Sequence, residues 1–153
     1  MRVELINPFL NATITVLETM AFVTPEAGKP YLKQAKVATG DVSSIVGITG
    51  KPDATFAISF DMESILIIMD KMLGRKLSEI TNEVGAAIGE IANMISGSAR
   101  RDLATHGIHY DGAIPSVVIG KDHELHHISD GPVIAIPFKL ENGVFTVELC
   151  FRD

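Results

Sequence analysis

The stretch Gly89-Glu90-Ile91-Ala92-Asn93-Met94-Ile95 decides how the fold is interpreted, because its spacing predicts a long helix with two unlike faces. Glu90 and Asn93 are three residues apart, so at about 100° per residue they share one face of a helix. Apolar residues with i, i+4, i+7, i+11 spacing form the opposite stripe, which consists of Val84, Ile88, Ile91 and Ile95. The pattern therefore predicts that the polar pair faces outward while the apolar stripe packs.

The residues around the polar pair are unusually small for a helix. Glycines at positions 85, 89 and 97 each weaken a helix by roughly 1 kcal/mol relative to alanine, and asparagine is itself a poor helix former. A helix that accepts these costs gains either close packing or a function. Ala86 and Gly97 flank the pair on the outward face, so another surface could come close, although an ordinary solvated helix face has the same pattern.

The composition limits the classes of function that are open to the chain. With 153 residues and 46% hydrophobic content, it has the length of one domain, covering residues 1–153, and ample material for a core. A net charge of −6 argues against a nucleic-acid binder, since the basic residues that cluster locally are too few for a phosphate-tracking groove, namely Lys71, Arg75, Lys76, Arg100 and Arg101. We expect no secretory signal, since no basic segment followed by a long apolar one is visible at the N-terminus, and no membrane span, since no apolar run approaches roughly 20 residues. The single cysteine, Cys150, is compatible with a reducing cytoplasm.

The elements on either side of the long helix predict an α+β fold. A first helix is expected to begin at Asn7-Pro8, with Asn7 as its N-cap, and the long helix is expected to run from Thr81 to about His106. Asp61 can cap a second helix that Gly74 closes. Strand-like residues lie at 35–39, 44–49 and 54–60, and again at 116–120, 132–138 and 144–151. The last two are expected to form a hairpin that turns at residues 141–143. The order is helix, three strands, two helices, three strands, which favours a mainly antiparallel sheet with helices packed on it.

Two other clusters are candidate sites, and the sequence favours neither. His123-Glu124-Leu125-His126-His127 has zinc-ligand chemistry, but such a run between strands is more often a polar loop. Glu4 and Asn7 repeat the Glu-x-x-Asn spacing. If Asn7 is the N-cap, however, Glu4 lies outside the helix and the two side chains do not share a face.

At residues 89–94 the sequence resembles the bacterial chemotaxis phosphatase family that includes CheC, CheX and the flagellar-switch protein FliY. The family signature is an acidic residue or serine, three residues, Glu, two residues, Asn, about twenty-two further residues and then a proline. Glu90 and Asn93 match, Pro115 arrives one residue early, and Ala86 occupies the acidic-or-serine position. The resemblance covers nearly the whole chain. Other similar stretches are residues 6–9 and 16–20, which resemble the first helix of CheX-type members, and residues 46–50 and 57–60, which resemble their central hairpin.

The resemblance implies both an architecture and an activity. CheC-type members carry two copies of the motif, and the one credible copy here is closer to CheX-type members, which form homodimers. The implied fold is a six-stranded sheet with two long helices on one face. The implied reaction is hydrolysis of the aspartyl phosphate of a CheY-like response regulator in the cytoplasm.

In that reaction Asn93 would orient the attacking water and Glu90 would pair with a partner lysine, while Ala86, Gly89 and Gly97 would let the helix enter the partner's cleft. No cofactor is expected on this chain, because the divalent metal would belong to the regulator. Two alternatives stay open, namely a response-regulator binding module without catalysis and a structural domain like that of the flagellar switch.

Overall fold

The computed structural model describes residues 3–152, which form three helices and eight short or long strands. The helices are α1 (Val3–Ala21), α2 (Met62–Leu73) and α3 (Asn82–Thr105). The strands are β1 (Glu26–Ala27), β2 (Tyr31–Lys33), β3 (Val42–Thr49), β4 (Ala54–Phe60), β5 (Asp111–Gly112), β6 (Ser116–Ile119), β7 (Val133–Leu140) and β8 (Gly143–Phe151). The chain is therefore α+β, as the sequence predicts.

The eight strands occupy six positions in one antiparallel sheet, which reconciles them with the expected six. The order is β1-β7-β8-β4-β3-β5, while β2 also pairs with β7 and β6 also pairs with β3. Each edge of the sheet is thus made of two short strands laid along one long strand. The long strands β3, β4, β7 and β8 form the centre, and β7 and β8 make the predicted hairpin around Glu141 and Asn142.

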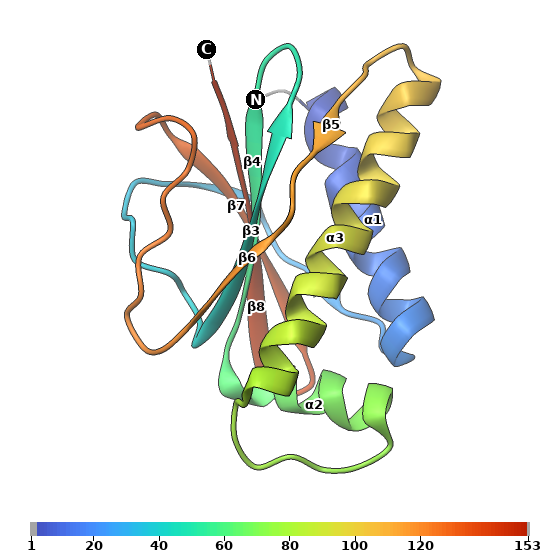
Figure 1. The fold of residues 1–153 in the computed structure, drawn as a ribbon, viewed down its shortest axis with the longest axis vertical. Coiled ribbons are helices and arrows are strands. Elements are labelled where there is room, and N and C mark those ends of the chain that lie inside the picture. The colour runs from blue at the N-terminus through green and yellow to red at the C-terminus, as the bar shows by residue number, and fades with distance from the viewer. Residues whose placement is uncertain (1–2, 153) are drawn as a thin grey trace.

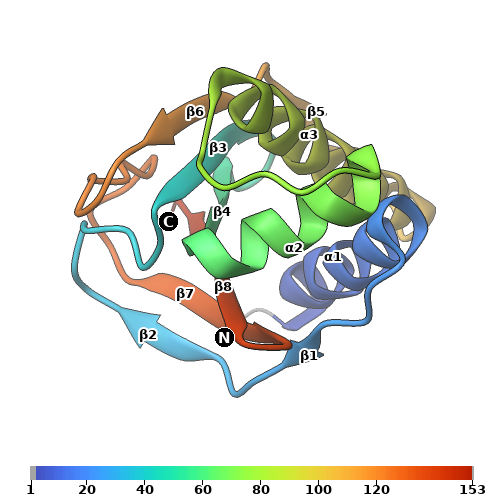
Figure 2. The same cartoon turned by 90° about the horizontal axis from the view of Figure 1, so that it is seen from below.

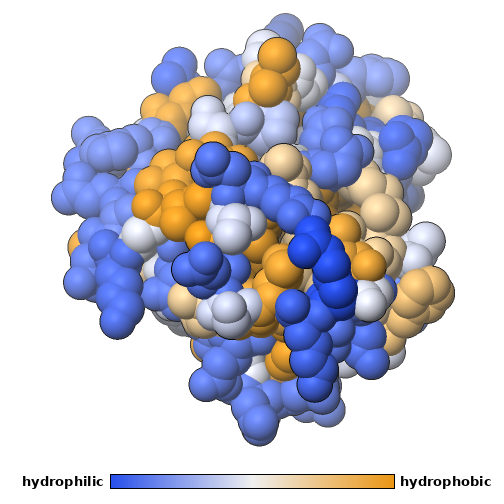
Figure 3. Space-filling view, turned by 60° about the horizontal axis from the view of Figure 1, so that its bottom comes forward, coloured by the Kyte–Doolittle hydropathy of each residue, from blue (hydrophilic) through white to orange (hydrophobic). Residues whose placement is uncertain are grey.

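The two long helices lie side by side on one face of the sheet and run in opposite directions, and α2 crosses their lower end (Figures 1 and 2). Between these helices and the sheet lies the main core, which includes the stacked rings of Phe9 and Phe56 at 5.4 Å. The end of the molecule at α2 shows hydrophobic surface broken up by hydrophilic side chains (Figure 3), with Met62 and Leu73 39% and 38% exposed.

Several local signals act as predicted. The Asp61 carboxylate accepts a hydrogen bond from the Ser64 N–H at 2.7 Å and so caps α2, which ends at Gly74 in the left-handed conformation with φ of 69°. The helix α3 begins after Thr81 and ends at the C-cap His106, before Gly107, whose φ is 79°.

The predicted start of the first helix is wrong, because α1 begins at Val3 and contains Pro8. Leu5 and Ile6 are 2% and 3% exposed in the core, so their burial extends the helix past the local cap signal. Pro8 is the sixth residue of α1 and has no backbone N–H, so the helix forms there without one intrahelical hydrogen bond. Asn7 is consequently a helical residue, and Glu4 lies in the first turn.

The predicted strand at residues 35–39 is also wrong, since only Val37 makes an isolated bridge there, to Glu124. This segment crosses the sheet face that carries no helix and pairs with the β6–β7 connection instead. The Ala38 N–H donates to the His123 carbonyl at 2.8 Å, and the Leu125 N–H donates to the Lys36 carbonyl at 2.7 Å. The strands that precede β3 in the chain are β1 and β2. They are too short for the alternating pattern of a strand to show in the sequence.

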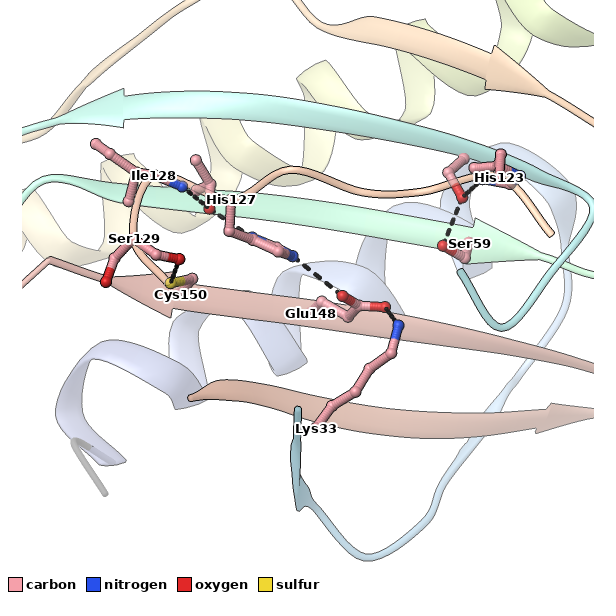
Figure 4. A network of polar contacts seen from close by, with 10 residues as sticks. Lys33, Ser59, His123, His127, Ile128, Ser129, Glu148 and Cys150 are labelled. Atoms are coloured by element: carbon pink, nitrogen blue, oxygen red, sulfur yellow. Dashed lines mark hydrogen bonds and ion pairs between the residues drawn. The ribbon is translucent and has the colours of Figure 1, made fainter. Parts of the chain in front are cut away.

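Residues 35–39 and the β6–β7 connection together form a cover over the sheet face that carries no helix. A buried polar network fastens this cover to the sheet (Figure 4). Lys33 on β2 donates to one oxygen of Glu148 on β8 at 2.7 Å, and His127 Nε2 lies 3.0 Å from the other oxygen. His127 Nδ1 hydrogen-bonds the Thr55 hydroxyl. The three ionisable side chains are at most 7% exposed. Burial raises the pKa of Glu148, but hydrogen bonds from His127 and Lys33 and the charge of Lys33 outweigh it, so that this pKa lies below its usual value of 4.5.

Replacing Gly143 by alanine is expected to lower the free energy of unfolding by about 1–3 kcal/mol. A Cβ there would lie 2.6 Å from the Ser64 Cα, so that α2 would have to move away from the β7–β8 hairpin. Gly47→Ala on β3 is the matched control, since its Cβ would meet nothing within 4 Å. Urea unfolding at constant m-value measures both variants, and equal stability of the two would contradict the packing argument.

The depressed pKa of Glu148 predicts a stability that depends on pH. A carboxyl group whose pKa is lower in the folded than in the unfolded state stabilises the fold above its unfolded value, and this contribution disappears as the pH falls through the folded pKa. The unfolding free energy of the wild type should therefore fall as the pH drops below about 4.5, and this part of the slope should be missing in Glu148→Gln.

Glu148→Gln should also cost about 3–5 kcal/mol at pH 7, because it leaves the buried Lys33 charge unpaired. Adding Lys33→Met removes that charge and should recover most of the loss. A double variant as unstable as the single one would mean that the Lys33–Glu148 ion pair is not the source of the effect.

Candidate functional site

The helix α3 presents the polar pair as the sequence predicts. Val84, Ile88, Ile91 and Ile95 are all 0% exposed and pack in the core. Glu90, Asn93 and Ala86 are exposed on the other side of the helix. The apolar stripe thus fixes the rotation of α3 about its own axis, and that rotation turns the carboxylate and the carboxamide outward together.

An open concavity of about 610 Å³ lies beside Glu90 and Asn93. One wall is α3 and the other is the segment from Gly112 to Val117, which contains the β5–β6 connection. Pro115 lines this second wall, so the three matching members of the sequence signature meet at one place. Ile114 in the same segment is 90% exposed. The concavity therefore leaves Glu90 and Asn93 accessible from outside the molecule.

The glycines of α3 explain how closely the two walls approach. A Cβ on Gly85 would lie 3.4 Å from Ile119, and a Cβ on Gly89 would lie 3.4 Å from Val117. Both glycines are buried, so their bare backbone lets α3 rest directly against β6. Gly89 therefore has a packing role within this chain, and its role in docking a partner stays a prediction.

A second concavity, of about 410 Å³, lies between α1 and α3. Asn93 and Arg100 line both concavities, and Gly97 and Arg101 line the second one. Asn93 is therefore accessible from both sides. Its amide offers a donor and an acceptor, which is enough to hold and orient a water molecule.

Two parts of the site were not predicted from the sequence, namely most of the wall from Gly112 to Val117 and the position of Arg100. Residues 112–115 carry no helical or strand periodicity. They lie beside α3 because Gly112 pairs with Ile48 of β3 and the Ala113 N–H donates to the Gly47 carbonyl at 3.0 Å. Arg100 offered a signal, since it lies seven residues after Asn93 and seven residues nearly complete two helical turns.

The second Glu-x-x-Asn pair needs a correction. Because α1 begins at Val3, Glu4 and Asn7 are both helical and both exposed on one side of α1, so the reason for separating them does not hold. They line a concavity of about 280 Å³ whose other charged or ionisable members are Asp102 and His106 of α3. This concavity lacks an equivalent of the Pro115 wall and carries an additional carboxylate.

The His123–His127 run is part of the cover described above. His123 hydrogen-bonds the Ser43 hydroxyl at 2.6 Å, His127 contacts Glu148, and His126 lies 3.4 Å from Glu124. Within residues 3–152, no group of three His, Cys, Asp or Glu side chains is placed to hold a metal ion. Over the same residues, no helix is long and apolar enough to cross a membrane.

Comparison with known proteins gives consistent matches. The family model described as chemotaxis phosphatase CheX matches residues 42–139. The CheY-P phosphatase CheX of Thermotoga maritima is 25% identical over 141 residues, which cover 92% of this chain and 90% of that protein.

Two solved structures cover nearly all of the chain. A CheC-like superfamily protein from Shewanella sp. PV-4 is 42% identical, with full coverage of both chains and a TM-score of 0.93. A complex of CheX with CheY, beryllium trifluoride and Mg²⁺ from Borrelia burgdorferi matches at 29% identity and a TM-score of 0.83, covering 99% of this chain and 100% of that one. The matching family model spans most of the chain, from β3 to β7, and the chain belongs to the CheX family of chemotaxis phosphatases.

Proposed function

We propose that this protein hydrolyses the aspartyl phosphate of a CheY-like response regulator, with Asn93 orienting the attacking water and Glu90 docking to a lysine of the partner. The observation that carries the proposal is the exposure of both side chains on one face of α3, beside an open concavity that Pro115 also lines. The relative from Thermotoga maritima is a CheY-P phosphatase, and the one from Borrelia burgdorferi was solved with CheY, which supports the same substrate class.

The chemistry needs little from this chain beyond position and charge. Water attacks phosphorus, the bond from phosphorus to the aspartyl oxygen breaks, and the products are a free carboxylate and inorganic phosphate. An acyl phosphate is already activated, so that holding the water in line supplies most of the catalysis. The neutral amide of Asn93 can do this without a shifted pKa, and the Glu90 carboxylate can make a charge-assisted hydrogen bond to a lysine.

The divalent metal of this reaction would be bound by the regulator, because Mg²⁺ is held by carboxylates together with phosphate oxygens. Ala86 and Gly97 leave room on the outward face for the partner's surface. Ala86 lines the same concavity as Glu90, where a larger polar side chain could contact a partner. The small alanine there favours close approach over such an extra contact. With this activity, the protein would act in the cytoplasm, where response regulators signal.

Asn93→Ala should lower the stimulated rate of regulator dephosphorylation by about 100-fold or more, because misplacing the attacking water by an ångström costs about that much. Glu90→Ala should mainly weaken binding of the regulator. The measurement is phosphate loss from a purified phosphorylated CheY-like regulator with each variant.

Asn7→Ala is the matched control, since Asn7 is an exposed asparagine of a Glu-x-x-Asn pair on α1. Activity that survives Asn93→Ala would overturn the proposed role of Asn93. Binding without any acceleration by the wild type would instead identify a binding module, and the absence of binding would favour a structural domain.

We also propose a homodimer, as the resemblance implies. The outer edge of β6 pairs with no other strand among the described residues, and its Val117, Val118 and Ile119 are 36%, 36% and 45% exposed. An unpaired, apolar edge strand is a template for pairing with a second copy.

Light scattering is expected to give about twice the 16.5 kDa chain mass. Val118→Lys should shift the protein to a monomer, because a charge on an edge strand opposes pairing. Val144→Lys, at another exposed valine, is the control (51% exposed). A monomeric wild type at working concentration would contradict the dimer.

A further inference from the structure

Two arginine side chains flank Gly97, one helical turn beyond Asn93. A Cβ placed on Gly97 would lie 3.4 Å from an Nη atom of Arg101 and 3.8 Å from an Nη atom of Arg100. Both guanidinium groups therefore lie over the bare backbone of this glycine. Together they line the concavity between α1 and α3, which Asn93 shares.

Neither arginine has an acidic partner within residues 3–152, where no carboxylate lies within 4.0 Å of either guanidinium. The neighbouring Asp102 and Asp111 do not pair with them. Arg75 offers a contrast, since it contacts the Glu83 carboxylate at 2.6 Å. Two uncompensated cations side by side repel each other, and an anion placed between them would remove that cost.

Arg100 is held in place by β5 without being neutralised. A Cβ on Gly112 would lie 2.9 Å from the guanidinium carbon of Arg100, so this glycine makes the space in which the guanidinium lies. Arg100 Nε also donates a long hydrogen bond, 3.4 Å, to the Ser96 hydroxyl. The side chain is half-buried, so it presents its charge at a set position beside the site.

The exposed stripe of α3 is consequently polarised along its length. Glu90 is negative at one end, Arg100 and Arg101 are positive at the other, and the neutral Asn93 lies between them. A partner that pairs a lysine with Glu90 and carboxylates with the arginines can dock in one direction only. Electrostatic complementarity of this kind sets register and speeds association.

We propose that Arg100 and Arg101 form a docking site for surface carboxylates beside the phosphorylation site of the regulator. The proposal rests on the function proposed above for Glu90 and Asn93. Arginine is suited to this role because its planar group binds carboxylates through two parallel hydrogen bonds. A carboxylate, not the phosphoryl group, is the expected anion, because the phosphoryl group must lie at the water that Asn93 holds, about 6 Å along the helix from Gly97.

The test compares the variants Arg100→Gln/Arg101→Gln and Gly112→Ala with the wild type. The charge-matched control is Lys29→Gln/Lys139→Gln, which removes two exposed lysines near the opposite edge of the sheet. Affinity is measured for the unphosphorylated regulator and for its beryllofluoride form, at low and at high salt. Hydrolysis is measured on the phosphorylated regulator as kcat and KM separately.

The double arginine variant should bind both forms of the regulator about tenfold more weakly at low salt, and the difference should shrink at high salt. KM should rise by a similar factor while kcat stays unchanged. Gly112→Ala keeps the charge but displaces the Arg100 guanidinium, so it should reproduce part of the loss. It should have no further effect once Arg100 is glutamine. Lys29→Gln/Lys139→Gln should behave like the wild type.

Unchanged affinity in the double variant would overturn the proposal and leave the phosphatase standing. A loss confined to the beryllofluoride form, or a fall in kcat at constant KM, would also overturn it and would assign the arginines to the phosphoryl group. Weaker binding by the variant together with no hydrolysis by the wild type would support the docking site and reject the phosphatase. Failure of the wild type to bind either form would overturn both.

Discussion

The burial of one stripe of α3 against the sheet is the constraint on which the site depends. Four branched aliphatic residues with no solvent exposure fix how the helix is rotated, and Gly85 and Gly89 fix how closely it approaches β6. Because interiors are close-packed, neither the rotation nor the separation can drift without opening a cavity. The position of Glu90 and Asn93 at the surface is therefore set by residues on the other side of the helix. Groups that must align with a partner gain from being held on such a rigid element.

The sheet supports this arrangement from its two faces with different chemistry. The face under the helices is apolar and includes stacked aromatic rings. The other face carries the Lys33–Glu148–His127 network and is covered by segments without regular structure. Hydrogen bonds to a buried carboxylate depend strongly on geometry, so the network selects one position for a cover that has little apolar surface of its own. Because the cover shields the second face of the sheet, all three helices can pack on the first face, and the outer side of α3 remains available for the site.

The sequence allowed much of the fold to be predicted, and the failures have physical causes. The stripe of α3, the cap at Asp61 and the β7–β8 hairpin follow from local periodicity and turn chemistry, which the structure keeps. The start of α1 was misjudged because the burial of Leu5 and Ile6 outweighs the cap signal of Asn7. Residues 35–39 have strand propensity but meet only a loop. Within the site, the sequence motif was enough to predict Glu90, Asn93 and Pro115. The wall at Gly112 and the position of Arg100 could not be predicted, because they depend on pairings between segments that are distant in the sequence.

The division of both sheet edges into short strands has a consequence for solubility. A long, flat edge would invite any extended chain to add to the sheet and propagate into a fibre. Here the outer strands are two, three, two and four residues long, and segments without regular structure separate them, so that any pairing, including that proposed for β6, is limited to a short strand. Such interruptions stop an added chain after a few hydrogen bonds. The molecule can thus keep a wide, strongly hydrogen-bonded sheet at its centre and still resist amyloid-like growth.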